Sequence, residues 1–106
     1  MTFLGDSRKV LQGLPTNLRR QAGLQLYELQ QGHEPDDWKP MATVGMGVNE
    51  IRLRDETGIA RVFYVAKFEE AVYILHAFEK KTQKTDDRDI EIGRRRYKAL
   101  MEERRR

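Results

Sequence analysis

Three stretches between positions 48 and 78 have the composition and spacing of β-strands. In the first, VNEIRLRD, Ile51 and Leu53 alternate with charged residues, the pattern of a strand with one buried face. The turn sequence DETG follows it and suits a tight β-hairpin. The second stretch covers Ile59–Phe68, and after two glutamates the third covers Val72–Phe78. Three strands joined by short turns predict an antiparallel meander.

Helical periodicity precedes and follows this meander. Hydrophobic spacing predicts a short helix over residues 6–14 and a longer one over 18–31. Gly23 costs the longer helix about 1 kcal/mol relative to alanine, and Gly32 occupies the position of a left-handed C-terminal cap. Thr85 or Asp86 can cap a final helix that runs towards Glu103.

The order of elements predicts an α+β fold. A short strand at residues 2–4 precedes two helices, the meander and the C-terminal helix, and the first two helices are expected to cover one face of the sheet. Residues 33–44 are interpreted as a connector because Pro35 and Pro40 interrupt regular structure. The other face of the sheet would display Arg52, Arg54 and Arg61 together with the lysines beyond Phe78.

The chain carries its positive charge in the C-terminal half. Residues 1–50 hold 5 Lys and Arg against 6 Asp and Glu, whereas residues 51–106 hold 15 against 11. The stretch AVYILHAFEKKTQKT concentrates this charge, because an apolar strand containing His76 runs directly into Lys80, Lys81 and Lys84. Cations on a rigid strand end suit an anionic polymer, so nucleic acid is the first expected partner and a membrane surface the second.

Composition removes several classes of site. The chain has no cysteine, and its two histidines are far apart and not at metal-ligand spacing, so neither disulfides nor a metal or other cofactor is expected. With 106 residues, one domain spanning 1–106 is expected. No apolar run approaches the roughly 20 residues of a membrane span, and no signal-peptide pattern precedes the first helix. A small soluble cytoplasmic protein is therefore predicted.

Several strings in the chain resemble the RelE/ParE toxin superfamily, and most closely its HigB-like, phage-derived toxins. The strings are FLGDSRKVL, LQLYELQQG, DWKPM, GVNEIR, RVFYVAKF, LHAFEKKTQKT and DIEIGRRRY, and together they cover nearly the whole chain. The resemblance implies a RelE-like fold and a toxin of a type II toxin–antitoxin pair. HigB-like toxins cut mRNA in the translating ribosome without a metal, through attack of a ribose 2′-OH on the adjacent phosphate.

The resemblance also implies roles for individual residues. Arg61 matches a strand arginine that contacts phosphate, and Lys81, or Lys80 one place earlier, matches the basic position that ends the last strand. Lys84 is expected to act with them in catalysis. The expected RNA contacts are Lys39, Arg52, Arg54 and Lys80. Tyr64 and His76 are the remaining groups able to move a proton, although His76 lies in an apolar strand that favours a buried, hydrogen-bonded role.

One difference from related toxins affects the chemistry. No histidine follows Tyr97 in this chain, whereas some HigB toxins end in an acid–Tyr–His pattern, so arginine and lysine are expected to act instead. The resemblance further implies an antitoxin partner, commonly one with a helix-turn-helix DNA-binding domain. Two alternatives remain open, namely a ParE-like toxin that poisons gyrase and a phage-derived nucleic-acid-binding regulator that has lost toxicity.

Overall fold

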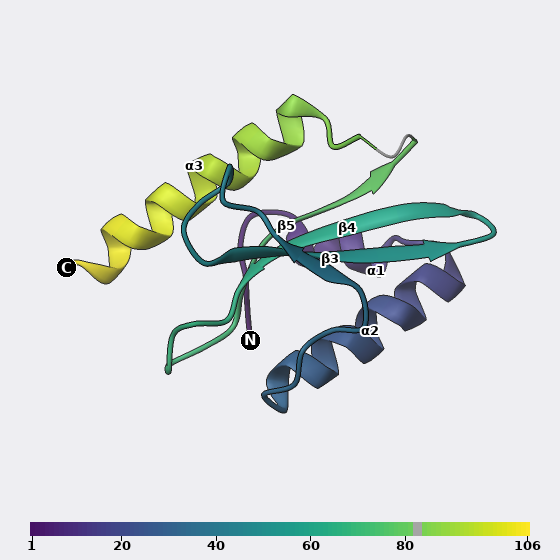
Figure 1. The fold of residues 1–106 in the computed structure, drawn as a ribbon, viewed down its shortest axis with the longest axis horizontal. Helices are drawn as coiled ribbons and strands as arrows, with labels where there is room; N and C mark the ends of the chain where they lie inside the picture. Colours follow the sequence, from purple (N-terminus) through teal and green to yellow (C-terminus); the bar gives the residue numbers. More distant parts are fainter. Residues whose placement is uncertain (82–83) are drawn as a thin grey trace.

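The protein folds as a five-stranded mixed sheet with three helices (Figure 1). The computed structural model describes residues 1–81 and 84–106. The elements in chain order are β1 (Thr2–Phe3), α1 (Ser7–Gln12), α2 (Thr16–Gln30), β2 (Trp38–Pro40), β3 (Val48–Asp55), β4 (Gly58–Val65), β5 (Tyr73–Lys80) and α3 (Asp87–Arg104). The strand order across the sheet is β1-β5-β4-β3-β2. This arrangement confirms the predicted α+β class and is compatible with a RelE-like fold.

The central meander forms as the alternation predicts. β3 pairs with β4 and β4 with β5, both antiparallel. The Asp55 carboxylate closes the first hairpin, since its Oδ1 accepts hydrogen bonds from the backbone N–H of Thr57 at 2.7 Å and of Gly58 at 3.2 Å. Such local acceptance of backbone donors is how aspartate favours a turn.

The predicted strand ends need correction. The second strand stops at Val65 and not at Phe68, because Val65 pairs with Val48, where β3 begins, and no partner continues beyond it. The third strand covers Tyr73–Lys80, because its last residue pairs with Ile59. β1 lies parallel to β5, so the sheet is mixed.

The predicted connector contains a short strand. β2 pairs antiparallel with β3 along residues 38–40, and Pro40 lies opposite Asn49. Because β2 is an edge strand, its proline needs no partner for the missing N–H. Contrary to the prediction, Pro40 therefore does not interrupt regular structure but lies in the edge strand of the sheet.

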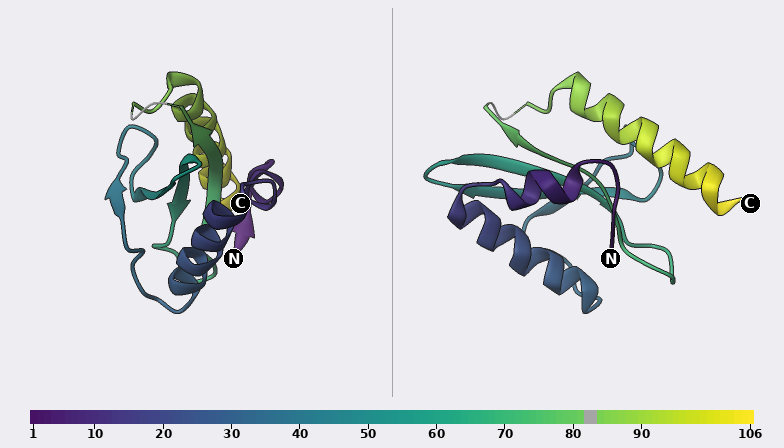
Figure 2. Two further views of the ribbon diagram at one scale, coloured as in Figure 1. Left: turned by 90° about the vertical axis from the view of Figure 1, so that its right-hand side faces the viewer. Right: turned by 180° about the vertical axis from the view of Figure 1, so that it is seen from behind.

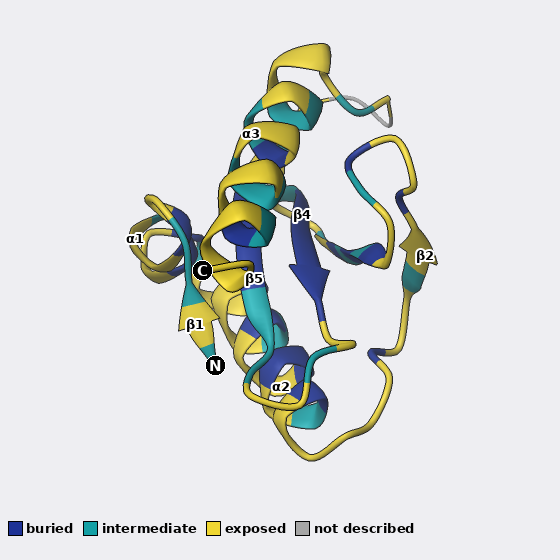
Figure 3. Cartoon of the chain, turned by 90° about the vertical axis from the view of Figure 1, so that its left-hand side faces the viewer, coloured by how far each residue is buried: buried dark blue, intermediate teal, exposed yellow. Residues whose placement is uncertain are grey.

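The two long helices lie on opposite sides of the sheet (Figures 1 and 2). Beneath α1 and α2, one hydrophobic cluster joins Leu18 and Leu26 to sheet residues such as Ile51. Under α3, a second cluster joins Leu100 to Phe63 and its neighbours. The prediction that basic residues occupy an open second face is therefore only partly right, because α3 covers part of that face. β4 lies between both clusters and is largely buried (Figure 3).

The helix ends follow local rules. Gly32 adopts a φ of +84°, as expected for a left-handed C-terminal cap. The helix before it begins earlier than predicted, at Thr16, with Pro15 as its N-cap. Asp86 caps α3 by accepting a hydrogen bond from the Arg88 backbone N–H at 2.8 Å. In the described part of the chain, no helix combines the length and hydrophobicity needed to cross a bilayer.

Candidate phosphate-binding site

Two arginines lie directly opposite each other on the α3 side of the sheet. Arg52 on β3 pairs with Arg61 on β4, which in turn pairs with Phe78 on β5. Residues in direct register share a face, and like charges so placed destabilise a sheet. A pair that works against stability in this position indicates a functional requirement for positive charge.

A buried carboxylate partly balances this charge. Glu50 is 1% exposed and its Oε1 lies 3.6 Å from Nε of Arg61, which is itself only 2% exposed. Arg61 Nη1 donates to the carbonyl of Ala60 at 3.2 Å, but its Nε is buried without a hydrogen bond. Burial lowers the pKa of Arg61, Glu50 opposes that shift, and Arg52 adds to it. Arg61 therefore keeps an unused N–H donor beside the basic surface.

Lys80 at the end of β5 belongs to the same group. Its Nζ donates to Thr85 Oγ1 at 3.3 Å, and that hydroxyl donates to Glu50 Oε2 at 3.4 Å. Burial lowers the pKa of Lys80, and the positive charges of Arg61, Lys39 and Arg52 lower it further against the opposing effect of Glu50. A lowered pKa makes the neutral form of Lys80 easier to reach than that of an ordinary exposed lysine.

The remaining predicted basic residues surround this group at the surface. Lys39 lies opposite Glu50 in the β2–β3 pair and is exposed, and Arg54 is exposed near the β3–β4 turn. Lys81 and Lys84 are exposed and line, together with Lys80, a cleft of about 590 Å³. The part of the LHAFEKKTQKT string at positions 82–83 lies outside the described residues.

His76 is held in place by α3. It is 5% exposed, its Nε2 lies 2.8 Å from Asp89 Oδ1, and its Nδ1 lies 3.3 Å from Arg96 Nη1. Because the guanidinium can only donate, Nδ1 accepts its hydrogen bond, and the Nε2–H donates to the Asp89 carboxylate. The ring also stacks on Phe78, with centroids 5.0 Å apart. Both nitrogens are engaged, which favours the structural interpretation of this histidine over proton transfer.

Tyr64 lies away from the basic group. It is 2% exposed and packs in the cluster beneath α1 and α2, on the opposite face from Arg61. Burial raises the pKa of its hydroxyl. The structure therefore brings together Arg61, Arg52, Lys39 and Lys80, with Lys81 and Lys84 beside them, and separates Tyr64 from all of these.

Comparison with known families identifies the chain. A family model described as Phage derived protein Gp49-like (DUF891) matches residues 9–98. The chain belongs to this family. The matched range runs from α1 into α3 and includes every residue of the basic group. No curated protein matches the sequence.

The Gp49-like family is phage-derived and toxin-like, related to the RelE type. At that level the resemblance inferred from the sequence strings is confirmed, and the fold agrees with it.

Sequence reasoning missed three residues of this Gp49-like site. Alternation places Glu50 on the arginine face, but a charged residue in an alternating strand gives no signal that it is buried there. Thr85 and Asp89 gave no signal, because their contacts depend on how α3 docks. Among the described residues, no group of three His, Asp or Glu side chains could hold a metal ion.

Proposed function

We propose that this Gp49-like protein is the toxin of a type II toxin–antitoxin pair and cleaves mRNA in the translating ribosome, as HigB-like toxins do. One observation supports this proposal most. Arg61, whose Nε–H has no hydrogen-bond partner, lies on the same face of the sheet as Lys80, whose pKa is lowered. RNA cleavage through the 2′-OH needs a group that binds phosphate and a group that accepts a proton. This pair offers one of each.

The proposed reaction proceeds at a single phosphodiester. Neutral Lys80 accepts the proton of the ribose 2′-OH, and the 2′-oxygen attacks the adjacent phosphorus. The P–O5′ bond breaks, and the leaving 5′-oxygen takes a proton from a cationic lysine of the cleft, Lys81 or Lys84. The products are a 2′,3′-cyclic phosphate and a 5′-hydroxyl end.

Arg61 would stabilise the negative charge that develops on the phosphorane oxygens. Preorganised cations in a site of low water content are effective in this role. Because Arg61 is 2% exposed, its contact with phosphate requires neighbouring side chains to move aside when RNA binds. Exposed Lys39 and Arg54 and half-buried Arg52 would hold flanking phosphates.

This mechanism differs from the sequence-based assignment in one residue. The resemblance implies Lys81 as the catalytic lysine, with Lys80 as the alternative one place earlier. Lys80 shares a face with Arg61, since residue 78 pairs directly with residue 61 and side chains alternate along the strand. Lys81 follows the end of β5 and is exposed. We therefore assign proton acceptance to Lys80.

The test is to induce the protein in bacterial cells and to map the 5′ ends of mRNA. Cuts confined to translated regions, with 5′-hydroxyl ends, are expected. Replacing Lys80 with glutamine should lower the cleavage rate by about 10²–10⁴-fold, the usual contribution of a positioned base. Lys80→Arg should be equally impaired, because it keeps the charge but not a proton-accepting amine. Lys9→Gln, an exposed lysine on α1, is the matched control.

A pH profile on purified toxin and ribosomes separates proton transfer from charge. Because Lys80 must be neutral to act, the rate should rise with pH to an inflection below the ordinary lysine value of 10.5. That inflection should disappear in Lys80→Gln. Intact mRNA with damaged DNA would instead favour the gyrase alternative, and induction without growth arrest would favour the regulator.

The same proposal implies an antitoxin that holds the protein inactive, expected to carry a helix-turn-helix DNA-binding domain. Co-expression with the product of the neighbouring gene should restore growth and yield a stable complex. Failure of both would contradict the toxin–antitoxin assignment.

A further inference from the structure

A threonine hydroxyl links the lysine of the basic group to its buried carboxylate. Thr85 Oγ1 lies 3.3 Å from Lys80 Nζ and 3.4 Å from Glu50 Oε2. The other oxygen of this carboxylate, Oε1, lies 3.6 Å from Arg61 Nε. Lys80 ends β5, Glu50 belongs to β3, and Thr85 directly precedes Asp86, the N-cap of α3. Two strands and the start of a helix therefore meet at one oxygen atom.

The hydrogen bonds at Thr85 have a defined direction. An ionised carboxylate can only accept, so the Thr85 hydroxyl donates its single hydrogen to Glu50. The lone pairs of the hydroxyl then face Lys80, and the lysine must be the donor. A neutral amine keeps N–H groups and can make the same hydrogen bond. Thr85 therefore orients the Lys80 amine in both of its protonation states.

The docking of α3 fixes the position of Thr85. Asp89, in the first turn of that helix, accepts a hydrogen bond from His76 Nε2 at 2.8 Å. His76 and Lys80 lie on the same face of β5, because side chains alternate along a strand. β5 thus holds the start of α3 at His76 and contacts the residue before its N-cap at Lys80. This gives His76 a function although both of its ring nitrogens are engaged.

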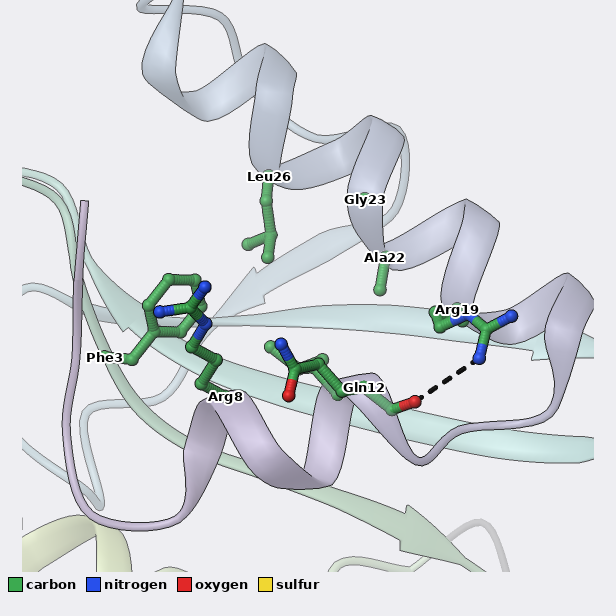
Figure 4. Close-up of a pocket in the computed structure, with 8 residues that line it drawn as sticks. Phe3, Arg8, Gln12, Arg19, Ala22, Gly23 and Leu26 are labelled. Carbon is green, nitrogen blue, oxygen red and sulfur yellow. Dashed lines mark hydrogen bonds between the residues drawn. The ribbon is translucent and has the colours of Figure 1, made fainter.

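The cleft beside Lys80 differs from the other hollows of the molecule. It has a volume of about 590 Å³, and every described residue that lines it is charged. The hollow between α1 and α2, of about 200 Å³, belongs to the other side of the sheet and is lined by apolar groups such as Phe3, Ala22 and Leu26 (Figure 4). An RNA phosphate suits the charged cleft, so this is where the Lys80 amine has to be aimed.

We propose that Thr85 is a positioning residue for RNA cleavage, and that its hydroxyl, held by Glu50, aims the Lys80 amine at the ribose 2′-OH. The inference rests on the proposed function, because that function supplies the reaction. Enzymes commonly orient a catalytic base through a third group that does not itself react. Thr85 touches neither the RNA nor the reacting atoms, so its whole effect passes through Lys80.

The first test compares cleavage rates of purified variants with ribosomes and mRNA. Thr85→Val replaces the hydroxyl with a methyl group of similar size, and the rate at high pH should fall about 10- to 100-fold, as expected when a reacting group is misplaced by about 1 Å. Thr85→Ser keeps the hydroxyl and should stay within about threefold of the unaltered protein. Thr16→Val, at an exposed threonine that begins α2, is the matched control.

The pH profile separates positioning from support of the fold. The hydrogen bond to Thr85 favours the charged form of Lys80, so its loss should move the inflection of the Thr85→Val profile to lower pH. The variant should thus reach its plateau at lower pH and at a lower rate. A lower rate with an unchanged inflection would show that Thr85 only supports the fold, and would overturn the inference.

A double variant tests whether Thr85 acts through Lys80. Adding Thr85→Val to Lys80→Gln should change the residual cleavage rate by less than about threefold, because the amine that Thr85 orients is already absent. A further tenfold loss in the double variant would contradict the inference.

The outcomes also separate this inference from the proposed function. If the unaltered protein leaves mRNA intact on the ribosome, both fail. If it cleaves mRNA and Thr85→Val cleaves equally fast, the ribonuclease assignment stands and only the role of Thr85 is overturned.

Discussion

At the scale of single residues, the buried pair of Glu50 and Arg61 is not symmetrical. The carboxylate lies among several cations. Glu50 raises the pKa of both Arg61 and Lys80, whereas Arg52 lowers both and Lys39 lowers that of Lys80. Removing Glu50 leaves cations that repel one another around a buried guanidinium. Removing Arg61 leaves a carboxylate that still has cationic neighbours. The acid therefore matters more for folding than its principal partner does.

Glu50→Gln is expected to lower the free energy of unfolding by about 3 kcal/mol, the lower part of the range for breaking a buried ion pair. Arg61→Gln should cost less than Glu50→Gln, and the double variant should fall between the two, because Glu50 still has cationic neighbours when Arg61 is absent. Urea unfolding of the three variants measures this, with Glu56→Gln in the exposed turn as the control. An Arg61→Gln variant less stable than Glu50→Gln would contradict the charge argument.

How far the sequence predicts the site depends on whether it shows which face of the sheet each side chain lies on. Alternation separates the two faces within each strand, and the pairing of Arg52 with Arg61 then puts both on one face. The sequence could not decide between Lys80 and Lys81, because a shift of one residue reverses the face and only the pairing of Arg61 with Phe78 fixes it. The burial of the Arg61 side chain could not be predicted either, because it depends on the contact with Glu50 and on the packing around Arg61.

At the scale of elements, an ion pair attaches the end of α3 to the connection between β4 and β5. Arg104 Nε donates to Glu70 Oε2 at 2.7 Å and its Nη2 to Oε1 at 3.2 Å, a bidentate geometry. The guanidinium also lies 3.5 Å from the centroid of the Phe68 ring. The hydrogen bonds from Arg104 are the main cause that lowers the pKa of Glu70 to about 2.

This shift predicts a dependence of stability on pH. The folded-state pKa lies below the ordinary value of 4.5, so the contribution is present above pH 4.5 and is lost as the pH falls towards 2. Thermal unfolding between pH 5 and pH 2 should show a smaller fall in Tm for Glu70→Gln than for the unaltered protein. Glu69→Gln, the exposed neighbour, should follow the unaltered curve. Parallel curves for Glu70→Gln would contradict the assignment.

The elements also show which boundaries local patterns can predict. The cap at Asp86 and the left-handed Gly32 depend on neighbouring residues only, and both were predicted. β2 was missed because a three-residue edge strand containing a proline has no periodicity of its own. It forms because Trp38 pairs with Ile51, a contact that no local pattern contains.

At the scale of the whole molecule, one sheet separates two hydrophobic clusters, and β4 belongs to both. Val62 contributes to the cluster beneath α1 and α2, and Phe63 to the cluster beneath α3. The sequence indicated the first cluster through its helical stripes. The second was not predicted, because α3 is strongly charged and its few apolar residues gain a partner only when it docks on β5. Opening either face therefore exposes the same central strand.

This arrangement predicts the order of amide hydrogen exchange. Amides of β4, such as that of Val62, should exchange only through global unfolding, because the strand has neighbours on both sides and a cluster on each face. The amides of Thr2 and Met41 should exchange orders of magnitude faster, although both donate at 2.8 Å, to the carbonyls of Val72 and Val48. Since both of these hydrogen bonds are short, their position at the two edges of the sheet must cause the faster exchange. Native-state exchange followed by NMR in low denaturant measures all three, and equal protection of Met41 and Val62 would show that the edge strand unfolds together with the centre.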